Sequence, residues 1–321
     1  MEKNQDDTRY IGVDIGGTCI KMGLFTSDGT LTEKWSIPTN LSDHGSYILP
    51  DIAASIQNKI KDASLNMQCI AGVGVGVPGP VDEYGIVTRC VNLGWDVINV
   101  IQILEDSLGV PVRAGNDANV AALGEMYRGG GQGYNNLVMV TLGTGVGGGI
   151  IIDGKILNGV NGSGGEIGHI HMKDDETDAC GCGNHGCLEQ YASANGIVKL
   201  TKQYLKLHSS DSAPTTLRDI SSLSCEDIFK VAKEGDSVAV MMVDQVCDYL
   251  GRALACVSAV VNPEVFVIGG GMSHAGDFLI QKIQSRYQSY AFHAARETGF
   301  HLAKLGNDAG IYGGVRLALN D

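Results

Sequence analysis

A histidine and three cysteines fall close together in a glycine-rich stretch of the chain. The stretch reads GHIHMKDDETDACGCGNHGC, and its thiols are Cys180, Cys182 and Cys187. One imidazole and three thiolates suit tetrahedral zinc, and the short C-x-C and C-x4-C spacings let a loop wrap the ion. Four protein ligands would close the site, so we expect a structural zinc. Spacing alone favours His169 only modestly over His171 and His185 as the fourth ligand.

Two glycine–threonine segments have the composition of phosphate-binding loops. They consist of Gly16, Gly17 and Thr18, and of Gly143, Thr144 and Gly145. Glycine lets backbone N–H groups approach an anion, and threonine adds a hydroxyl donor. There is no GxxxxGK[ST] motif, and the two GxGxxG matches (74–79 and 143–148) run into prolines or a strand, which excludes a dinucleotide fingerprint. We therefore expect two phosphate clamps; the alternative for each segment is a tight structural turn.

Three acidic residues could act on a hydroxylated substrate. Asp117 follows a predicted strand over 110–114 and precedes a predicted helix over 120–126. It is therefore either an N-cap or a carboxylate at the carboxyl end of a strand, where α/β sites usually lie. Glu166 and Glu189 flank the cysteine cluster. They are either solvated charges or acceptors for sugar hydroxyls, which carboxylates bind through charge-assisted hydrogen bonds.

Apolar runs and glycine-rich breaks predict the elements that position these residues. We expect strands over 10–15, 20–25, 70–77, 137–142, 150–152 and 265–268, and helices over 48–60 and 238–261. The strand–loop–strand unit IGVDIGGTCIKMGLF is echoed by LVMVTLGTGVGGGII, with GTGVGGG as the expected loop, which fits a duplicated lobe. Residues 209–224 are expected to form a surface loop. The alternation of strands and helices predicts an α/β protein.

The composition excludes several classes of protein. The chain has 321 residues, 44% of them hydrophobic and 18% charged, which excludes a disordered chain. Its formal net charge of −13 argues against nucleic acid as a partner. No uninterrupted apolar run approaches about 18 residues and the first residues lack a secretory signal's apolar core, so we expect no membrane association. Six of the nine cysteines are scattered, and we expect them in the core.

Taken together, these motifs resemble the ROK family of sugar kinases, and most closely its bacterial ATP-dependent glucokinases. The resemblance runs nearly end to end. It rests on DIGGT (14–18), GVPGPV (76–81), VNLGW (91–95), NDANVAALGE (116–125), LGTGVGGGI (142–150), GEIGHI (165–170), CGCGNHGCLE (180–189), IGGGMS (268–273) and LGNDAG (305–310). One departure is Cys19, where such kinases often have Lys or Thr. The 13 residues before Asp14 hold no helix-turn-helix, which argues against the repressor branch.

The resemblance implies an actin-like, ribonuclease-H-like ATPase fold with two α/β lobes and a central cleft. The N-terminal lobe would cover 1–118 and be completed by about 303–321. The C-terminal lobe would cover 119–302 and carry the zinc-binding loop.

The resemblance also implies a role for each motif residue. Asp117 would be the catalytic base. The sugar would be bound by Gly79, Asn116, Asp117, Glu166, His169 and Glu189. The zinc ligands would be His169, Cys180, Cys182 and Cys187, which settles the choice among the histidines. ATP would be bound by Asp14, Gly16, Gly17, Thr18, Lys21, Gly143, Thr144, Gly145, Gly269, Gly270 and Gly271, with Asp14 nearest to Mg²⁺, through water.

The implied activity is transfer of a phosphoryl group from ATP to the 6-hydroxyl of glucose. The alternatives are a kinase for another sugar, such as N-acetylmannosamine, fructose or allose, and a non-catalytic sugar-sensing protein. An intact Asp117 and two phosphate clamps argue against the sensor. The resemblance further implies a homo-oligomer, dimer or tetramer, in the cytoplasm.

Overall fold

The computed structural model describes residues 8–210 and 212–319, which divide into two compact units. Of the described residues, the first unit comprises 8–135, 149–165 and 305–319, and the second comprises 136–148, 166–210 and 212–304. The lobe boundaries expected from the sequence, at residues 118 and 302, remain a prediction. Within the described residues, no helix is long and apolar enough to cross a membrane.

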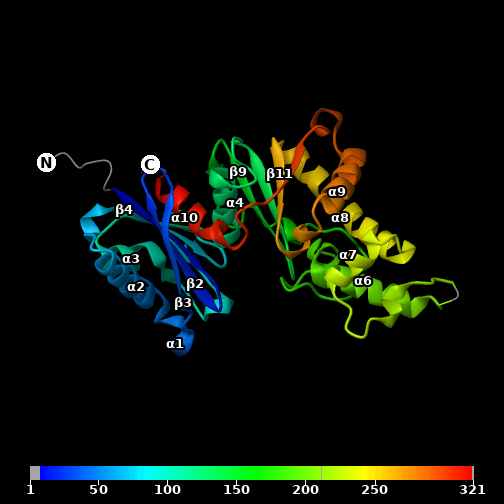
Figure 1. Ribbon diagram of the computed structural model, residues 1–321, viewed down its shortest axis with the longest axis horizontal. Helices are drawn as coiled ribbons and strands as arrows, with labels where there is room; N and C mark the ends of the chain where they lie inside the picture. Colours follow the sequence, from blue (N-terminus) through cyan, green and yellow to red (C-terminus); the bar gives the residue numbers. More distant parts are fainter. Residues whose placement is uncertain (1–7, 211, 320–321) are drawn as a thin grey trace. The chain divides into compact units, whose positions relative to one another are not determined.

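The first unit is built on a five-stranded sheet with the order β3-β2-β1-β4-β7. Strands β1, β2 and β3 pair antiparallel, whereas β1, β4 and β7 pair parallel. Figure 1 shows this sheet with its helices. The elements are β1 (Arg9–Ile15), β2 (Cys19–Thr26), β3 (Leu31–Pro38), α1 (Ser42–Gly45), α2 (Ile48–Asp62), β4 (Ile70–Val77), β5 (Ile86–Val87), β6 (Ile98–Asn99), α3 (Val100–Leu108), β7 (Val112–Asn116), α4 (Asp117–Arg128), β10 (Lys155–Ile156) and α10 (Ala309–Leu319).

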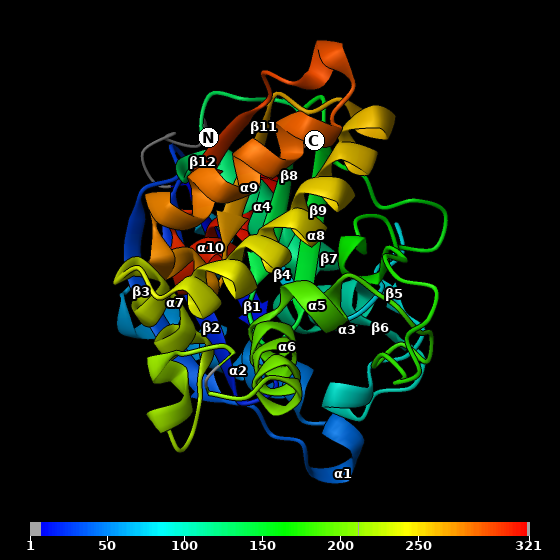
Figure 2. The ribbon, with the colours of Figure 1, turned by 90° about the vertical axis from the view of Figure 1, so that its right-hand side faces the viewer.

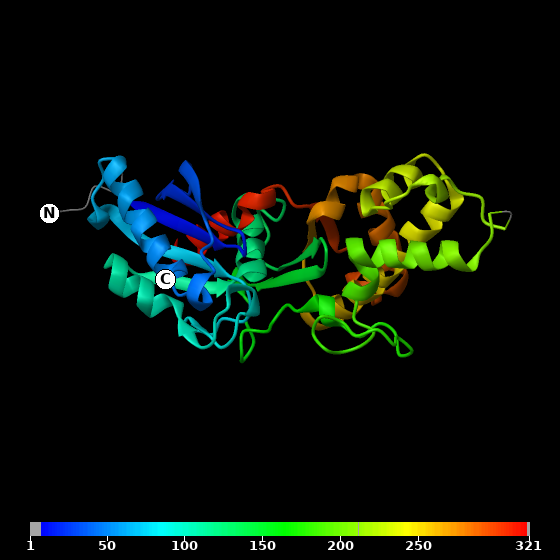
Figure 3. The ribbon, with the colours of Figure 1, turned by 90° about the horizontal axis from the view of Figure 1, so that it is seen from below.

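Side-chain alternation along β1 assigns the helices to the two faces of this sheet. Ile11, Val13 and Ile15 are buried in the cluster that also contains the apolar residues of α2 and α3. The intervening Gly12 faces α10 instead, because a Cβ there would lie 1.9 Å from the backbone oxygen of Ile311. The period of two therefore places α2 and α3 on one face and α10 on the other, as Figure 3 also shows.

The second unit contains β8, β11, β12 and the start of β9, which belong to a sheet with the order β10-β9-β8-β11-β12 in which β8, β11 and β12 pair parallel. Strand β9 (Val146–Ile152) begins in the second unit and ends in the first. The elements are β8 (Leu137–Leu142), α5 (Glu189–Ala192), α6 (Ala194–Leu207), α7 (Cys225–Lys233), α8 (Ser237–Val261), β11 (Val265–Gly269), α9 (Asp277–Tyr290) and β12 (Gly299–Leu302). Both sheets thus combine a strand hairpin with a parallel portion.

An aromatic cluster joins α9 to the parallel strands of the second sheet. The ring of Phe266 packs against Tyr287 and Phe300 at centroid distances of 5.4 and 5.1 Å. The buried hydroxyl of Tyr287 donates to the backbone oxygen of Ala295 at 2.6 Å. Helix α8 packs beside α9, and Figure 2 shows α8 running across the strands. These large buried rings form part of the hydrophobic core between α9 and the second sheet.

Most predicted elements are observed at or near the expected bounds, and two corrections are informative. Strand β9 starts at Val146, so the expected loop GTGVGGG is confined to its first residues. Gly147 and Gly149 lie inside the strand, at positions where Thr141 and helix α4, respectively, leave no space for a side chain. The expected loop over 209–224 contains a short 3₁₀ helix, Thr216–Asp219.

The expectation that six cysteines outside the cluster lie in the core is only partly right. Cys90 and Cys247 are buried, and Cys19, Cys69 and Cys225 are half-buried. Cys256, on α8, is exposed, because it lies on the outer side of a helix whose inner side packs on α9.

Candidate functional site

The first glycine–threonine segment is a tight hairpin between β1 and β2. The N–H of Gly16 donates to the oxygen of Cys19 at 3.1 Å, and a Cβ on Gly16 would lie 2.8 Å from that oxygen. Gly17 and Thr18 are exposed at the tip. Exposed backbone beside an exposed hydroxyl can bind an anion.

An acidic and a basic side chain stand at the base of this hairpin. Lys21 Nζ lies 3.5 Å from Asp14 Oδ2 and donates to the backbone oxygen of Asn307 at 3.2 Å. Burial raises the pKa of Asp14 above its ordinary value, and Lys21 offsets part of that rise. A nearby cation stabilises the charged form of such a carboxylate, so Asp14 can bind a magnesium ion through a water molecule.

Asn116 and Asp117 stand where β7 passes into α4. Asn116, which is 8% exposed, caps the helix: its Oδ1 accepts the N–H of Asn119 at 3.1 Å. Its Nδ2 donates to the oxygen of Gly79 at 3.1 Å. The cap is therefore Asn116, and the alternative reading of Asp117 as the N-cap is wrong. Asp117 is the first residue of α4, where the partial positive charge of the helix favours a carboxylate.

Gly79 has a backbone conformation that suits glycine, with φ +96°. Its oxygen is fixed by Asn116, so the loop after β4 and the start of α4 form one rigid corner. The first unit thus brings together Gly79, Asn116 and Asp117.

The second glycine–threonine segment is held against a carboxylate. The N–H of Gly143 donates to the oxygen of Gly145 at 3.0 Å, which closes the turn between β8 and β9. Glu189 Oε2 accepts the N–H of Val146 at 3.0 Å, and a Cβ on Gly145 would lie 2.1 Å from that same Oε2. Only glycine at 145 therefore leaves Glu189 in place, while Thr144 stays exposed.

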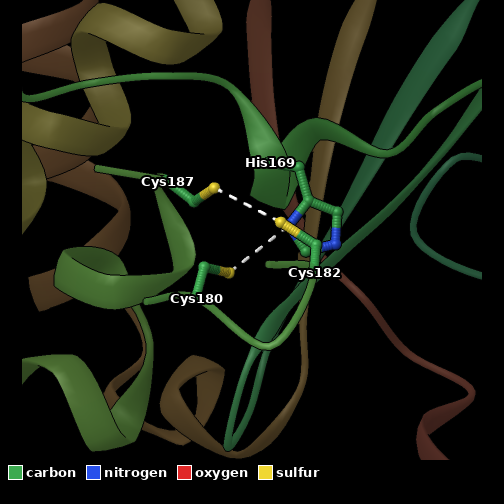
Figure 4. A group of neighbouring side chains, drawn as sticks. All are labelled: His169, Cys180, Cys182 and Cys187. Atoms are coloured by element: carbon green, nitrogen blue, oxygen red, sulfur yellow. Dashed lines mark hydrogen bonds between the residues drawn. The ribbon is translucent and has the colours of Figure 1, made fainter. Parts of the chain in front are cut away.

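One histidine and three cysteines converge in the second unit, and Figure 4 shows them pointing toward a common centre. The four ligand atoms, from His169, Cys180, Cys182 and Cys187, all lie within 4.8 Å of one another. Cys180 Sγ lies 3.7 Å from His169 Nδ1, and Cys182 Sγ lies 3.7 Å from Cys187 Sγ. Such spacing fits a small tetrahedral ion of the zinc type.

The surroundings of the three thiols differ. Burial raises the pKa of Cys180, and it raises the pKa of Cys187 to about 12. The backbone N–H of Asn184 lowers the pKa of Cys182. A divalent cation at the centre would deprotonate all three, so the thiols fit the ion despite the burial of Cys180 and Cys187.

His171 and His185 of this loop are not part of the cluster. His171 is engaged outside the cluster, with Nδ1 3.0 Å from the oxygen of His185 and Nε2 2.9 Å from Asp174. Asp174 raises the pKa of His171 through this hydrogen bond. Of the candidates that spacing left open, His169 alone lies in the cluster.

His169 presents its two ring nitrogens to different partners. Nδ1 faces Cys180, whereas Nε2 lies 3.9 Å from Glu166 Oε2. An ion on Nδ1 would leave the proton on Nε2, which would then be available to a substrate oxygen. Glu189 connects the cluster to the Gly145 turn, because its Oε1 accepts from Cys180 at 3.8 Å.

A cavity of about 860 Å³ opens beside the second glycine–threonine turn. Its lining includes Gly143 and Thr144 of this turn, Gly271 and Met272 of the third glycine-rich segment, and five residues of α7. Gly270 has φ +80°, and a Cβ there would lie 2.5 Å from the oxygen of Leu142. The residues that line the cavity are Gly143, Thr144, Ala194, Cys225, Glu226, Phe229, Lys230, Lys233, Glu234, Gly271, Met272, His274 and Ala275.

Sequence reasoning missed the contribution of α7 to this cavity. Phe229 is buried and supplies an apolar surface, and Lys230 and Lys233 supply positive charge. The amphipathic run from Cys225 to Lys233 signals a helix, but nothing in it signals a cavity wall. The size and mixed lining suit a nucleoside with attached phosphates.

Comparison with known proteins gives this geometry a context. A model of the ROK family matches residues 10–321. The chain is 41% identical over 310 residues to a glucokinase from Halalkalibacterium halodurans, covering 96% of this chain and 94% of that protein.

Solved structures agree with this similarity. A ROK family glucokinase from Streptomyces griseus, crystallised with glucose and AMPPNP, is 32% identical with a TM-score of 0.73, covering 96% of this chain and 98% of that one. A ROK hexokinase from Thermus thermophilus is 28% identical with a TM-score of 0.80, covering 97% of both chains. The fold is therefore that of ROK sugar kinases, the actin-like ATPase fold.

Proposed function

Because this chain belongs to the ROK family, we propose that it is an ATP-dependent glucokinase, which transfers the terminal phosphoryl group of ATP to the 6-hydroxyl of glucose. The observation that carries the proposal is the similarity to glucokinases along nearly the whole chain. The rigid corner at Asn116 and Asp117 supports it, because phosphoryl transfer depends mainly on positioning and charge.

Asp117 is the proposed catalytic base. Its carboxylate accepts the proton of the 6-hydroxyl as the new oxygen–phosphorus bond forms, and the bond to ADP breaks. General base catalysis of this kind contributes typically about 10²–10⁴-fold. The proposed sugar-binding residues are Gly79, Asn116, Asp117, Glu166, His169 and Glu189. Amide, imidazole and carboxylate groups in this set can both donate to and accept from sugar hydroxyls.

ATP is proposed to bind at the two glycine–threonine turns and in the cavity beside α7. The residues are Asp14, Gly16, Gly17, Thr18, Lys21, Gly143, Thr144, Gly145, Gly269, Gly270 and Gly271. When bound, Mg²⁺ would supply charge neutralisation on the phosphates, with Asp14 holding it through water. The lysines of α7 favour the same negative charge.

A structural zinc is proposed at His169, Cys180, Cys182 and Cys187. It would order the loop and fix His169 with its Nε2 proton available to the sugar. We also propose that the chain forms a homo-oligomer, dimer or tetramer, and works in the cytoplasm. Sedimentation of the purified chain tests the assembly.

The direct experiment is an ADP-release assay across a panel of sugars with ATP. We expect phosphorylation of glucose, with the product identified as glucose 6-phosphate, and much lower kcat/KM for N-acetylmannosamine, fructose and allose. Preference for another sugar would move the assignment within the sugar kinases. No activity with any sugar, while glucose still binds, would favour a sensor.

A further inference from the structure

Helix α4 carries a fully buried carboxylate that the proposed mechanism does not use. Glu125 is 0% exposed. Burial of a carboxylate is costly unless hydrogen bonds compensate it, and here two backbone donors do so. Glu125 Oε2 accepts the N–H of Gly130 at 2.7 Å, and Oε1 accepts the N–H of Leu305 at 2.8 Å.

The second donor stands where the chain re-enters the first unit. Leu305 is the first residue of the returning segment, 180 positions after Glu125. A short 3₁₀ helix, η8 (Gly306–Asp308), and then α10 follow it directly. The carboxylate thus fixes the start of this returning segment.

The far side of that segment packs on the proposed nucleotide-binding residues. The oxygen of Asn307 accepts from Lys21 Nζ at 3.2 Å. At Gly310, an added Cβ would lie 2.5 Å from the carboxyl carbon of Asp14, so the chain there presses directly on that carboxylate. Residues 305–310 therefore connect Glu125 to both Asp14 and Lys21.

The same helix carries the proposed base at its first residue. Asp117 precedes Glu125 by eight residues, a rise of roughly 12 Å along a rigid helix. Helix α4 also touches α10 without intervening side chains, since a Cβ on Gly124 would lie 2.1 Å from the oxygen of Ala309. Displacement of the 305–310 segment would therefore move Asp14 and Lys21, the proposed nucleotide contacts, and through α4 also Asp117, the proposed base.

We propose that Glu125 is a positioning residue for phosphoryl transfer. By holding Leu305, it fixes segment 305–310 to α4 and so sets Asp117 relative to Asp14 and Lys21, all within the first unit. This inference rests on the proposed kinase function. It predicts that loss of the contact impairs the chemical step more than the binding of either substrate, because misplacement by about 1 Å can cost 10²-fold in rate.

The test is Glu125→Gln, which keeps the shape but turns an amide donor toward one of the two backbone N–H groups. We expect kcat to fall at least tenfold, with the Kd values of glucose and a non-hydrolysable ATP analogue within threefold of wild type, measured by calorimetry. Rates are taken at a temperature where circular dichroism shows the variant fully folded. If it does not fold, Leu305→Pro decides, since proline lacks the same N–H and accepts the φ of −81° found there.

Glu105→Gln is the matched control. Glu105 Oε1 accepts the N–H of Val112 at 2.9 Å, so it is also a carboxylate that holds backbone in the first unit. We expect its change to lower Tm but leave kcat within twofold. A folded Glu125 variant with wild-type kcat, or an equal loss of kcat in Glu105→Gln, would overturn the inference alone. A wild type inactive toward glucose would overturn the proposed function, and this inference with it.

Discussion

Removal of one thiol from the histidine–cysteine cluster tests whether a metal ion sets sugar affinity. The change is Cys182→Ser, at the exposed ligand of the set, where loss of the sulfur disturbs packing least. His169 and Glu189 are the two proposed sugar contacts that touch the cluster, both through Cys180. Loss of the ion would release His169 from its fixed position, whereas Glu189 would still accept the N–H of Val146.

The expected magnitude follows from those contacts. Without an ion on Nδ1, His169 no longer keeps its proton on Nε2, and one hydrogen bond to the sugar weakens. A hydrogen bond to a charged or polarised group contributes about 1.5–3 kcal/mol. Since 1.4 kcal/mol is tenfold in affinity, we expect the glucose KM to rise about 10- to 100-fold. Asp117 lies outside the cluster, so kcat should fall less than about threefold.

The assay combines elemental analysis with steady-state kinetics on wild type, Cys182→Ser and the chelator-treated wild type. His171→Asn is the matched control, because His171 lies in the same loop but outside the cluster. It should retain about one zinc per chain and the wild-type glucose KM. An active wild type with no bound metal, or an unchanged glucose KM after complete removal of zinc, would refute the reasoning.

Two further changes test the surroundings of the nucleotide and the sugar. Burial raises the pKa of Asp14 above the ordinary 3.8, so the folded chain binds this proton more tightly than the unfolded chain does, and stability is lost as pH rises through the raised pKa. Asp14→Asn should therefore increase the Tm of the ligand-free chain at pH 7, and less so near pH 4, while abolishing activity. A lower Tm of this variant at pH 7 would contradict the expectation. Gly145→Ala should displace Glu189 and raise the glucose KM at least tenfold, whereas Gly181→Ala, where a Cβ has open space, should not; equal KM values in kinetics would refute the contact.

Local patterns predicted the strands well because each is a short apolar run with a clear end. The run from Ile70 to Val77 is observed as β4, since every inward position is apolar and Pro78 follows it. The long helix α8 ends at Val261, one residue position before its left-handed C-cap Asn262, so it stops before Pro263 as the sequence predicts. The start of β9 was misjudged because glycines at 147 and 149 look like loop until their neighbours are known.

Contacts between segments far apart in the chain could not be predicted from the sequence. The cysteine spacing predicted that three thiols converge, but the choice of His169 needed the family resemblance, because His171 is only two residues away. Glu125 looks like an ordinary solvated helix residue, and only the structure shows that its carboxylate is buried and accepts the N–H groups of Gly130 and of the returning Leu305. The role of Phe229 in the cavity wall depends in the same way on packing between distant segments.

The central claim is that the carboxylate of residue 117 takes the proton from the sugar hydroxyl. The direct measurement is kcat of Asp117→Asn at saturating ATP and glucose, beside Asp106→Asn, an exposed aspartate of the same unit, as control. Asparagine keeps the shape and still binds a hydroxyl, but it cannot accept the proton. We predict a fall in kcat of at least about 100-fold with glucose Kd within threefold, and unchanged kcat in the control. A kcat for Asp117→Asn within a few fold of wild type would contradict the account.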